Sequence, residues 1–226
     1  MKLSQFLNEY SVKHGRAFTE GAMAFVALDR PLDQVIRHVL ALGPHHPGEA
    51  SPWSHCFLIA EQYHGRKTKI LDCSIRDRRN RMLWGSTLEV DIEVLAKGVQ
   101  GCQGKIYSGY VSDYDNERVQ ACGLYFLPEL TAKERHKIVR VAAAMQKRGY
   151  RYDLPGLVRE LVRLLIGVTW KQGKRRLLFC SAFLATVYRT SLGKKWKIAP
   201  GIASVDITPD EIWYSGTGER ERILND

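Results

Sequence analysis

Short segments of strand length dominate the pattern of hydrophobic and polar positions in the first half of the chain. Some are continuous apolar runs, and others alternate between apolar and polar residues, as strands of a half-buried sheet do. The predicted strands are residues 21–28, 53–61, 67–74, 87–94 and 105–111. A short turn containing Gly65 separates the second strand from the third, which predicts an antiparallel hairpin.

Helical spacing of apolar positions dominates the second half of the chain. The helices predicted there are residues 132–147, 155–168 and 179–192, and two further helices, residues 2–18 and 31–42, are predicted in the first half. Pro31 and Pro155 each occupy a favoured first helical position. Thr131 and Glu134 have the spacing of a capping box, which fixes the start of the helix that follows them.

The order of these elements predicts the fold class. Strands come first and helices follow, so we expect a single α+β domain over residues 1–226, with an antiparallel sheet packed against helices. The chain is 45% hydrophobic and 26% charged, which excludes a disordered protein. Charged residues interrupt the apolar stretch 157–168, so no transmembrane segment is expected. The first residues do not resemble a signal peptide, so we expect a cytoplasmic protein as made, unless a signal-independent secretion system exports it.

The formal net charge of +10 favours anionic partners such as phospholipid, acidic cell-wall polymer or nucleic acid. Basic residues cluster at positions 76–81, 171–176 and 194–197, but each cluster is short and is typical of solvated surface. Trp84, Trp170 and Trp196 are interleaved with basic residues in the sequence. Aromatic rings in such a setting can stack on the bases of a nucleic acid. A non-enzymatic nucleic-acid-binding module is therefore an alternative, although nothing else in the sequence supports it.

Cysteine usage argues against a disulfide framework and a zinc site. The five cysteines are Cys56, Cys73, Cys102, Cys122 and Cys180, an odd number with no CxxC spacing. A cluster of His45, His46, Cys56 and His64 is conceivable as a metal site but has no supporting motif. We therefore predict neither a metal ion nor a cofactor.

Cys180 is the candidate nucleophile, because it lies directly before the helical pattern of residues 179–192. The free backbone N–H groups and the positive end of the helix dipole favour a thiolate at that position. The competing interpretation is a cysteine that is simply packed in the core. His55, in the middle of a predicted strand, is the best candidate for the imidazole that a thiolate nucleophile needs.

The position of the hairpin turn suggests a carboxylate to orient His55. If the turn contains an even number of residues and Glu61 pairs with Arg66, opposed residue numbers sum to 127, and Asp72 lies opposite His55 on the same face. A three-residue turn would instead place Cys73 there. Asp72 could also be an ordinary residue near the end of a strand.

Several strings in the sequence resemble the circularly permuted papain-fold cysteine hydrolases, the YiiX-like relatives of the NlpC cell-wall peptidases and of lecithin retinol acyltransferase. They are WSHCFLIAE followed by LDC, then RGYRYD, FCSAFLATVYR and VDITPDEIWYS, within residues 21–215. The resemblance implies a papain-like fold, with Cys180 as nucleophile, His55 as general base and acid, and Asp72 as the orienting residue. It also places Tyr152 near the substrate, and we predict substrate contact for Trp53 as well. The chain departs from many relatives in having Asp72 in place of glutamate and in having Cys56 next to the histidine.

These features predict a cysteine hydrolase that works through an acyl-enzyme. We expect cleavage of amide bonds in cell-wall peptides, with hydrolysis or transfer of lipid acyl groups as the alternative in the same fold. Because no signal peptide is evident, delivery as an antibacterial effector into the periplasm of rival cells is a further hypothesis, and a cognate inhibitor protein would then be a partner. Nucleic acid is not an expected partner of the hydrolase.

Overall fold

The described part of the chain is an α+β fold built on one eight-stranded sheet. The computed structural model describes residues 2–42, 51–76, 103–153, 157, 162, 164, 177–198, 207–215 and 218–224. In sheet order the strands are β7 (Leu177–Leu178), β6 (Arg151–Tyr152), β4 (Gln103–Tyr110), β3 (Lys69–Arg76), β2 (His55–Ile59), β1 (Met23–Leu28), β5 (Val119–Phe126) and β8 (Glu219–Leu224). All neighbouring strands are antiparallel except β6 and β7, which are parallel.

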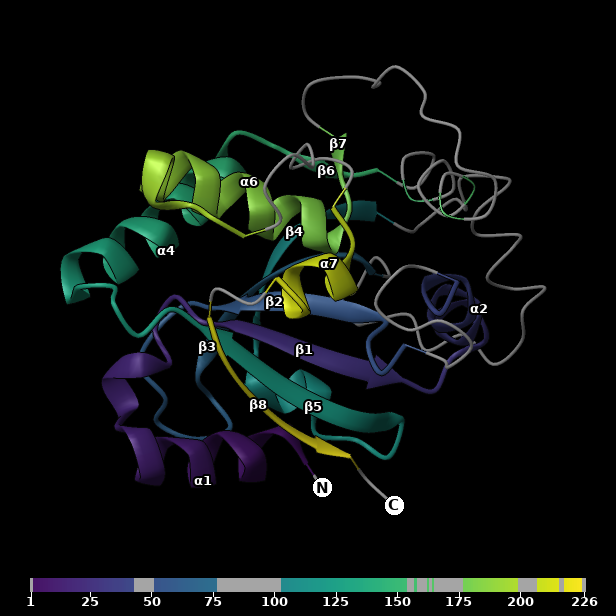
Figure 1. Ribbon diagram of the computed structural model, residues 1–226, viewed down its shortest axis with the longest axis horizontal. Coiled ribbons are helices and arrows are strands. Elements are labelled where there is room, and N and C mark those ends of the chain that lie inside the picture. Colours follow the sequence, from purple (N-terminus) through teal and green to yellow (C-terminus); the bar gives the residue numbers. More distant parts are fainter. Residues whose placement is uncertain are drawn as a thin grey trace.

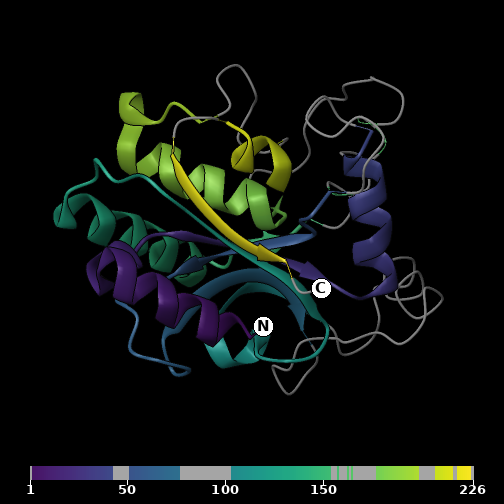
Figure 2. The ribbon, with the colours of Figure 1, turned by 60° about the horizontal axis from the view of Figure 1, so that its bottom comes forward.

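Helices cover both faces of the sheet (Figure 1). They are α1 (Leu3–His14), α2 (Pro31–Leu40), α4 (Ala132–Lys147), α6 (Cys180–Leu192) and α7 (Pro209–Trp213), with short 3-10 turns η1 (Arg16–Phe18), η2 (Val111–Tyr114) and η3 (Gly193–Lys195). Helices α4, α6 and α7 lie on one face, α1 lies on the other, and α2 stands beside one end of the central strands (Figure 2). None of the described helices has both the length and the hydropathy needed to cross a bilayer.

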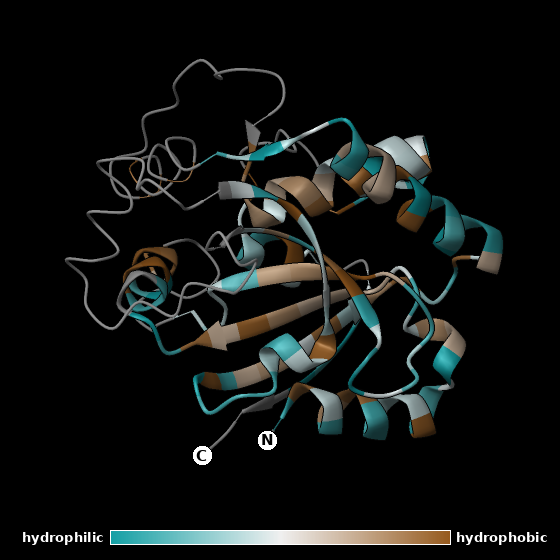
Figure 3. Cartoon of the chain, turned by 180° about the vertical axis from the view of Figure 1, so that it is seen from behind, coloured by the Kyte–Doolittle hydropathy of each residue, from teal (hydrophilic) through white to brown (hydrophobic). Residues whose placement is uncertain are grey.

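The central strands supply two separate hydrophobic cores. Cys56 and Leu58 of β2 belong to the core under α4 and α6, whereas Phe57 and Ile59 belong to the core beside α1. Successive side chains of a strand point to opposite faces, so one strand can serve both cores. This explains why β1 is apolar along its whole length (Figure 3) and is buried at each residue.

Most predicted elements within the described residues are confirmed. The strands predicted over 21–28, 53–61, 67–74 and 105–111 correspond to β1, β2, β3 and β4. Thr131 caps α4 as its spacing to Glu134 predicts, and Pro31 is the first residue of α2. The predicted strand 87–94 and most of the helix predicted after Pro155 lie outside the described residues.

The expectation that helices simply follow strands is wrong, because three of the four strands that the sequence pattern does not predict come after helix α4. Strands β6, β7 and β8 come after helix α4, and β5 lies between β4 and α4. β6 and β7 contain two residues each, too few to give an alternating pattern. β8 has the sequence ERERIL and, among the described strands, pairs only with β5, so its charged residues occupy an edge of the described sheet, where charge is common. The α+β class itself is unaffected.

Trp53 is a core residue, in contrast to its predicted role at the substrate. Its side chain is 0% exposed, and its ring lies 4.6 Å from that of Trp213 and 5.8 Å from that of Phe25, measured between centroids. Gly123 of β5 makes room for this cluster, because a Cβ atom there would lie 2.5 Å from Cη2 of Trp53. We therefore assign Trp53 to packing.

Replacing Gly123 by alanine should lower the free energy of unfolding by about 2 kcal/mol or more, the usual cost of overpacking a dense core. The added methyl group must displace two indole rings, since it would also lie 2.8 Å from Trp213. Urea denaturation of both proteins measures this difference. An unchanged transition midpoint would contradict the proposed fit between Gly123 and the tryptophans.

Candidate active site

Cys180 is the first residue of α6 and follows the N-cap residue Phe179. The first helical hydrogen bond runs from Phe183 N to Phe179 O, at 2.9 Å, so the backbone N–H groups of Cys180, Ser181 and Ala182 have no acceptor within the helix. These groups and the helix dipole favour negative charge at the N-terminus. The Cys180 side chain is 4% exposed.

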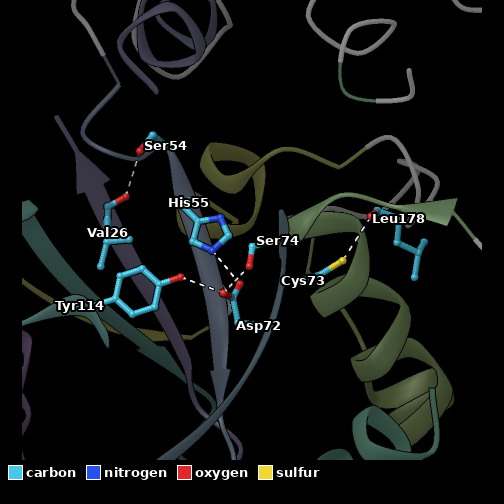
Figure 4. A network of polar contacts seen from close by, with 8 residues as sticks. All are labelled: Val26, Ser54, His55, Asp72, Cys73, Ser74, Tyr114 and Leu178. Atoms are coloured by element: carbon cyan, nitrogen blue, oxygen red, sulfur yellow. Dashed lines mark hydrogen bonds and ion pairs between the residues drawn. The ribbon is translucent and has the colours of Figure 1, made fainter. Parts of the chain in front are cut away.

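The residues just before Cys180 are fixed by two other strands. Leu178 of β7 pairs with Tyr152 of β6, and the Leu178 carbonyl accepts a hydrogen bond from Asp153 N at 2.9 Å. The thiol of Cys73, on β3, donates to the same carbonyl at 3.3 Å (Figure 4). The start of α6 is therefore held against the sheet at a defined point.

His55 is the first residue of β2 and is almost wholly buried, with 5% exposure. The preceding residue, Ser54, fixes the backbone here: its N–H donates to Val26 O at 3.1 Å, and its hydroxyl oxygen accepts from Leu28 N at 3.0 Å. Ser54 therefore anchors the start of β2 to the end of β1. A histidine held in this way has little freedom to leave its partners.

Asp72 of β3 lies at the centre of a polar network (Figure 4). Its Oδ1 accepts a hydrogen bond from His55 Nε2 at 2.8 Å. Its Oδ2 accepts from the hydroxyl groups of Ser74, at 2.6 Å, and Tyr114, at 3.1 Å. The ring of Tyr114 also stacks on that of His55, with centroids 6.0 Å apart and planes inclined by 21°. Because Nε2 bonds Asp72, Nδ1 is the nitrogen left for Cys180.

The structure pairs His55 with Asp72 by a register that differs from the predicted one. Leu58 pairs with Leu71 and Ile59 with Ile70, so opposed residue numbers sum to 129 instead of 127. Extended along the strands, this register sets Ser74 opposite His55 and makes Asp72 a diagonal neighbour. The predicted direct opposition is therefore wrong by two residues. Alternate residues of a strand point to the same face, so a register shift of two residues leaves Asp72 on the same face of the sheet as His55. Asp72 therefore still reaches the imidazole.

The electrostatic environment of Cys180 gives its thiol a lower pKa than that of an ordinary cysteine. A hydrogen bond from the Cys56 thiol makes the largest contribution and lowers the pKa of Cys180, against the effect of burial. The charge of His55 and hydrogen bonds from His55 and from the backbone of Cys56 lower the pKa further, to well below its usual value. These interactions favour the thiolate form of Cys180.

His55 shows the complementary change. Burial lowers its pKa, but the negative charges of Asp72 and Cys180 and the hydrogen bonds to both overcome this and raise the pKa to about 10. The histidine is therefore an imidazolium at neutral pH. Thiolate and imidazolium stabilise each other as a buried ion pair, the form in which a cysteine nucleophile is activated.

The other described cysteines have the opposite behaviour. Burial raises the pKa of Cys56 and Cys73 well above the usual value, and nearby negative charge adds to this effect. Burial also raises the pKa of Cys122, to about 12. These three remain neutral thiols under conditions in which Cys180 is ionised, and Cys102 lies outside the described residues.

A pocket opens beside the thiol, with about 340 Å³ of empty space that is partly open to solvent. Its described lining residues are Ile36, Leu40, Ser54, Tyr152, Leu157, Leu164, Phe179, Cys180, Ser181, Thr208 and Pro209. No Asp, Glu, Lys, Arg or His side chain occurs among them. Burial and the charge of Cys180 raise the pKa of Tyr152 well above its usual value, so its phenol keeps its proton and can donate a hydrogen bond.

The structure brings together Cys180, His55, Asp72 and Tyr152 from α6, β2, β3 and β6. Trp53 belongs to the core under α4 and α6 and is not among the described residues that line the pocket. Sequence reasoning missed the contacts of Ser74, Tyr114 and Cys56. The sequence does contain a signal for Ser74. It lies two residues from Asp72 on the same strand, so the two side chains are expected on the same face of the sheet.

The described residues contain no group of three or more His, Cys, Asp or Glu side chains arranged as metal ligands. His64 lies in the turn between β2 and β3, where Nδ1 bonds the carbonyl of Gln62 at 3.1 Å. His45 and His46 lie outside the described residues.

Comparison with known proteins adds no further assignment. No protein-family model matches the chain, and no curated protein sequence matches it significantly.

Changing Cys56 to alanine should raise the pKa of Cys180 by about one unit, because the thiolate loses a hydrogen bond worth roughly 1.5 kcal/mol. Cys56→Ser retains a donor of similar shape and should leave the pKa low. The ultraviolet absorbance of the thiolate, followed against pH with Cys180→Ala as the baseline, measures the change. Equal pKa values in the alanine and serine variants would show that the Cys56 side chain does not set the acidity.

Proposed function

We propose that the protein is a cysteine hydrolase that works through an acyl-enzyme at Cys180. The observation that carries this proposal is the buried chain of Cys180, His55 and Asp72, in which the thiol is acidified and the imidazole is held by a carboxylate. The positions of a nucleophile at a helix N-terminus and a histidine on a strand of an antiparallel sheet support a papain-like fold. His55 precedes Cys180 in the chain, as in the permuted papain-fold group that the sequence resembles.

The first half of the reaction follows from the charge states of this site. The Cys180 thiolate attacks the carbonyl carbon, and negative charge develops on the carbonyl oxygen. The backbone N–H of Cys180, at the start of α6, is available to stabilise that oxygen. The His55 imidazolium gives a proton to the leaving group, which leaves a neutral imidazole and a thioester.

The second half regenerates the enzyme. Neutral His55 takes a proton from water, and the resulting hydroxide attacks the thioester carbonyl. Collapse of the tetrahedral intermediate releases the acid and restores the thiolate and imidazolium. Asp72 stays ionised throughout and orients the imidazole, since its Oδ1 remains bonded to Nε2.

The pocket favours an apolar acyl group as the part of the substrate bound beside Cys180. Its described walls consist mainly of aliphatic and aromatic side chains, and its polar groups there are neutral hydroxyls and the thiol. A cell-wall stem peptide has free carboxylates, which are costly to place against an apolar surface. The lipid alternative is therefore better supported by the pocket than the cell-wall peptide that the sequence favours, and the net charge of +10 suits an anionic lipid surface.

Hydrolysis of p-nitrophenyl esters tests the proposal. The protein should cleave these esters, with kcat/KM rising from acetate to longer acyl chains by several-fold for each few carbons, because each buried CH₂ contributes up to about 0.8 kcal/mol. Cys180→Ala and His55→Ala should each lose activity by at least about a hundredfold. Cys122→Ala is the matched control, because it removes a buried thiol from the opposite core.

Two outcomes would change the assignment. Activity that survives Cys180→Ala would exclude the acyl-enzyme at this residue. Activity that depends on Cys180 but falls with chain length, together with cleavage of cell-wall stem peptides, would restore amide hydrolysis as the function.

A further inference from the structure

Asp72 is a fully buried carboxylate, with 0% exposure. Burial of a carboxylate is costly unless hydrogen-bond donors replace the lost water. The His55 imidazolium is one such partner, but it bonds only Oδ1. The other oxygen, Oδ2, also needs donors if Asp72 is to remain ionised during catalysis.

Two hydroxyl groups from different parts of the chain meet Oδ2. Ser74 lies two residues along the same strand, and its Oγ is 2.6 Å from Oδ2. Tyr114 belongs to η2, 42 residues away in sequence, and its hydroxyl oxygen is 3.1 Å from Oδ2 (Figure 4). Because the two donors come from different elements, they fix the plane of the carboxylate as well as its charge. Both side chains are buried.

Tyr114 is itself held firmly. Val111 N donates to Thr68 O at 2.9 Å, and Ser112 N donates to Arg66 O at 3.0 Å, which ties η2 to the turn after β2. The next residue after Tyr114, Asp115, accepts a hydrogen bond from Ser4 N of α1 at 2.9 Å. The N-terminal helix therefore helps to place a side chain that touches both Asp72 and the His55 ring.

We propose that Ser74 and Tyr114 are positioning residues of the reaction, which keep Asp72 ionised and aimed at His55 Nε2. The proposal rests on the proposed hydrolase function. Neither residue lines the pocket, so they act through Asp72 and not on the substrate. Loss of either donor makes protonation of the carboxylate easier, and a protonated Asp72 no longer stabilises the imidazolium.

The test uses Tyr114→Phe, which keeps the stacked ring and removes only the hydroxyl, and Ser74→Ala. Each variant should reduce kcat by at least about tenfold, the effect expected for one hydrogen bond to a charged group, while KM changes little. The acidic limb of the pH dependence of kcat should move to higher pH in both variants. Ser74→Thr keeps a hydroxyl and should restore most of the activity.

Matched controls separate positioning from general destabilisation. Tyr125→Phe removes a buried hydroxyl that lies 3.1 Å from Ser215 Oγ and belongs to the other core, and Ser11→Ala removes one that bonds Leu7 O. These controls should lower the melting temperature without moving the pH profile. If Tyr114→Phe is poorly folded, Ser74→Ala and Ser74→Thr still decide the question.

The outcomes distinguish this proposal from the function on which it rests. If the unaltered protein hydrolyses esters in a His55-dependent manner but Tyr114→Phe and Ser74→Ala behave like the controls, the positioning role is overturned alone. If the unaltered protein shows no chemistry at Cys180, the proposed function fails first.

Discussion

The structure of the site depends on one buried charge, the carboxylate of Asp72. It is fully excluded from solvent, and its bond to His55 Nε2 is 2.8 Å long. A negative charge in this position raises the pKa of His55, and the positively charged imidazolium contributes to lowering the pKa of Cys180. The acidity of the Cys180 thiol on α6 is therefore linked to a residue on β3 through the histidine on β2. Removing any member leaves a buried charge without its partner, which is costly.

The fold supplies the rigidity that such a chain of charges requires. Strands β2 and β3 are neighbours in the sheet, and each of the two residues is fixed by a further strand, since His55 pairs with Val26 of β1 and Asp72 pairs with Tyr107 of β4. Helix α6 is placed independently, because Leu178 just before it is bonded to β6 and β3. The pocket then forms where α6, α2 and α7 approach one another, and its walls are apolar. The acidified thiol beside this cavity is the basis on which we propose a substrate with a hydrophobic acyl group.

Local patterns in the sequence were sufficient to find the residues with intrinsic signals. Cys180 was identified because a helix N-terminus can be recognised from sequence, and the capping box at Thr131 was found for the same reason. The link between His55 and Asp72 followed from strand parity, which is robust to a register error of two residues. The exact register could not be predicted, because it depends on the conformation of the turn around Gly65.

Local patterns in the sequence do not predict contacts between segments that are far apart along the chain. Tyr114 reaches Asp72 from 42 positions away, and no periodicity in the sequence relates the two residues. From the sequence we predict substrate contact for Trp53, but the burial of this residue depends on Gly123 and Trp213, which are far along the chain. Strand β8 was missed because its charged sequence is stabilised by pairing with β5. Tertiary context decides each of these cases.

The most direct test of the ion pair is alkylation by iodoacetamide at about pH 6, where an ordinary thiol is almost entirely protonated. Peptide mass spectrometry gives the rate at each of the five cysteines, in the unaltered protein and in His55→Ala. The thiolate–imidazolium pair predicts fast labelling of Cys180 alone, and slow labelling of Cys180 once His55 is removed. Labelling of Cys180 no faster than that of the other cysteines, or equally fast without His55, would contradict the account.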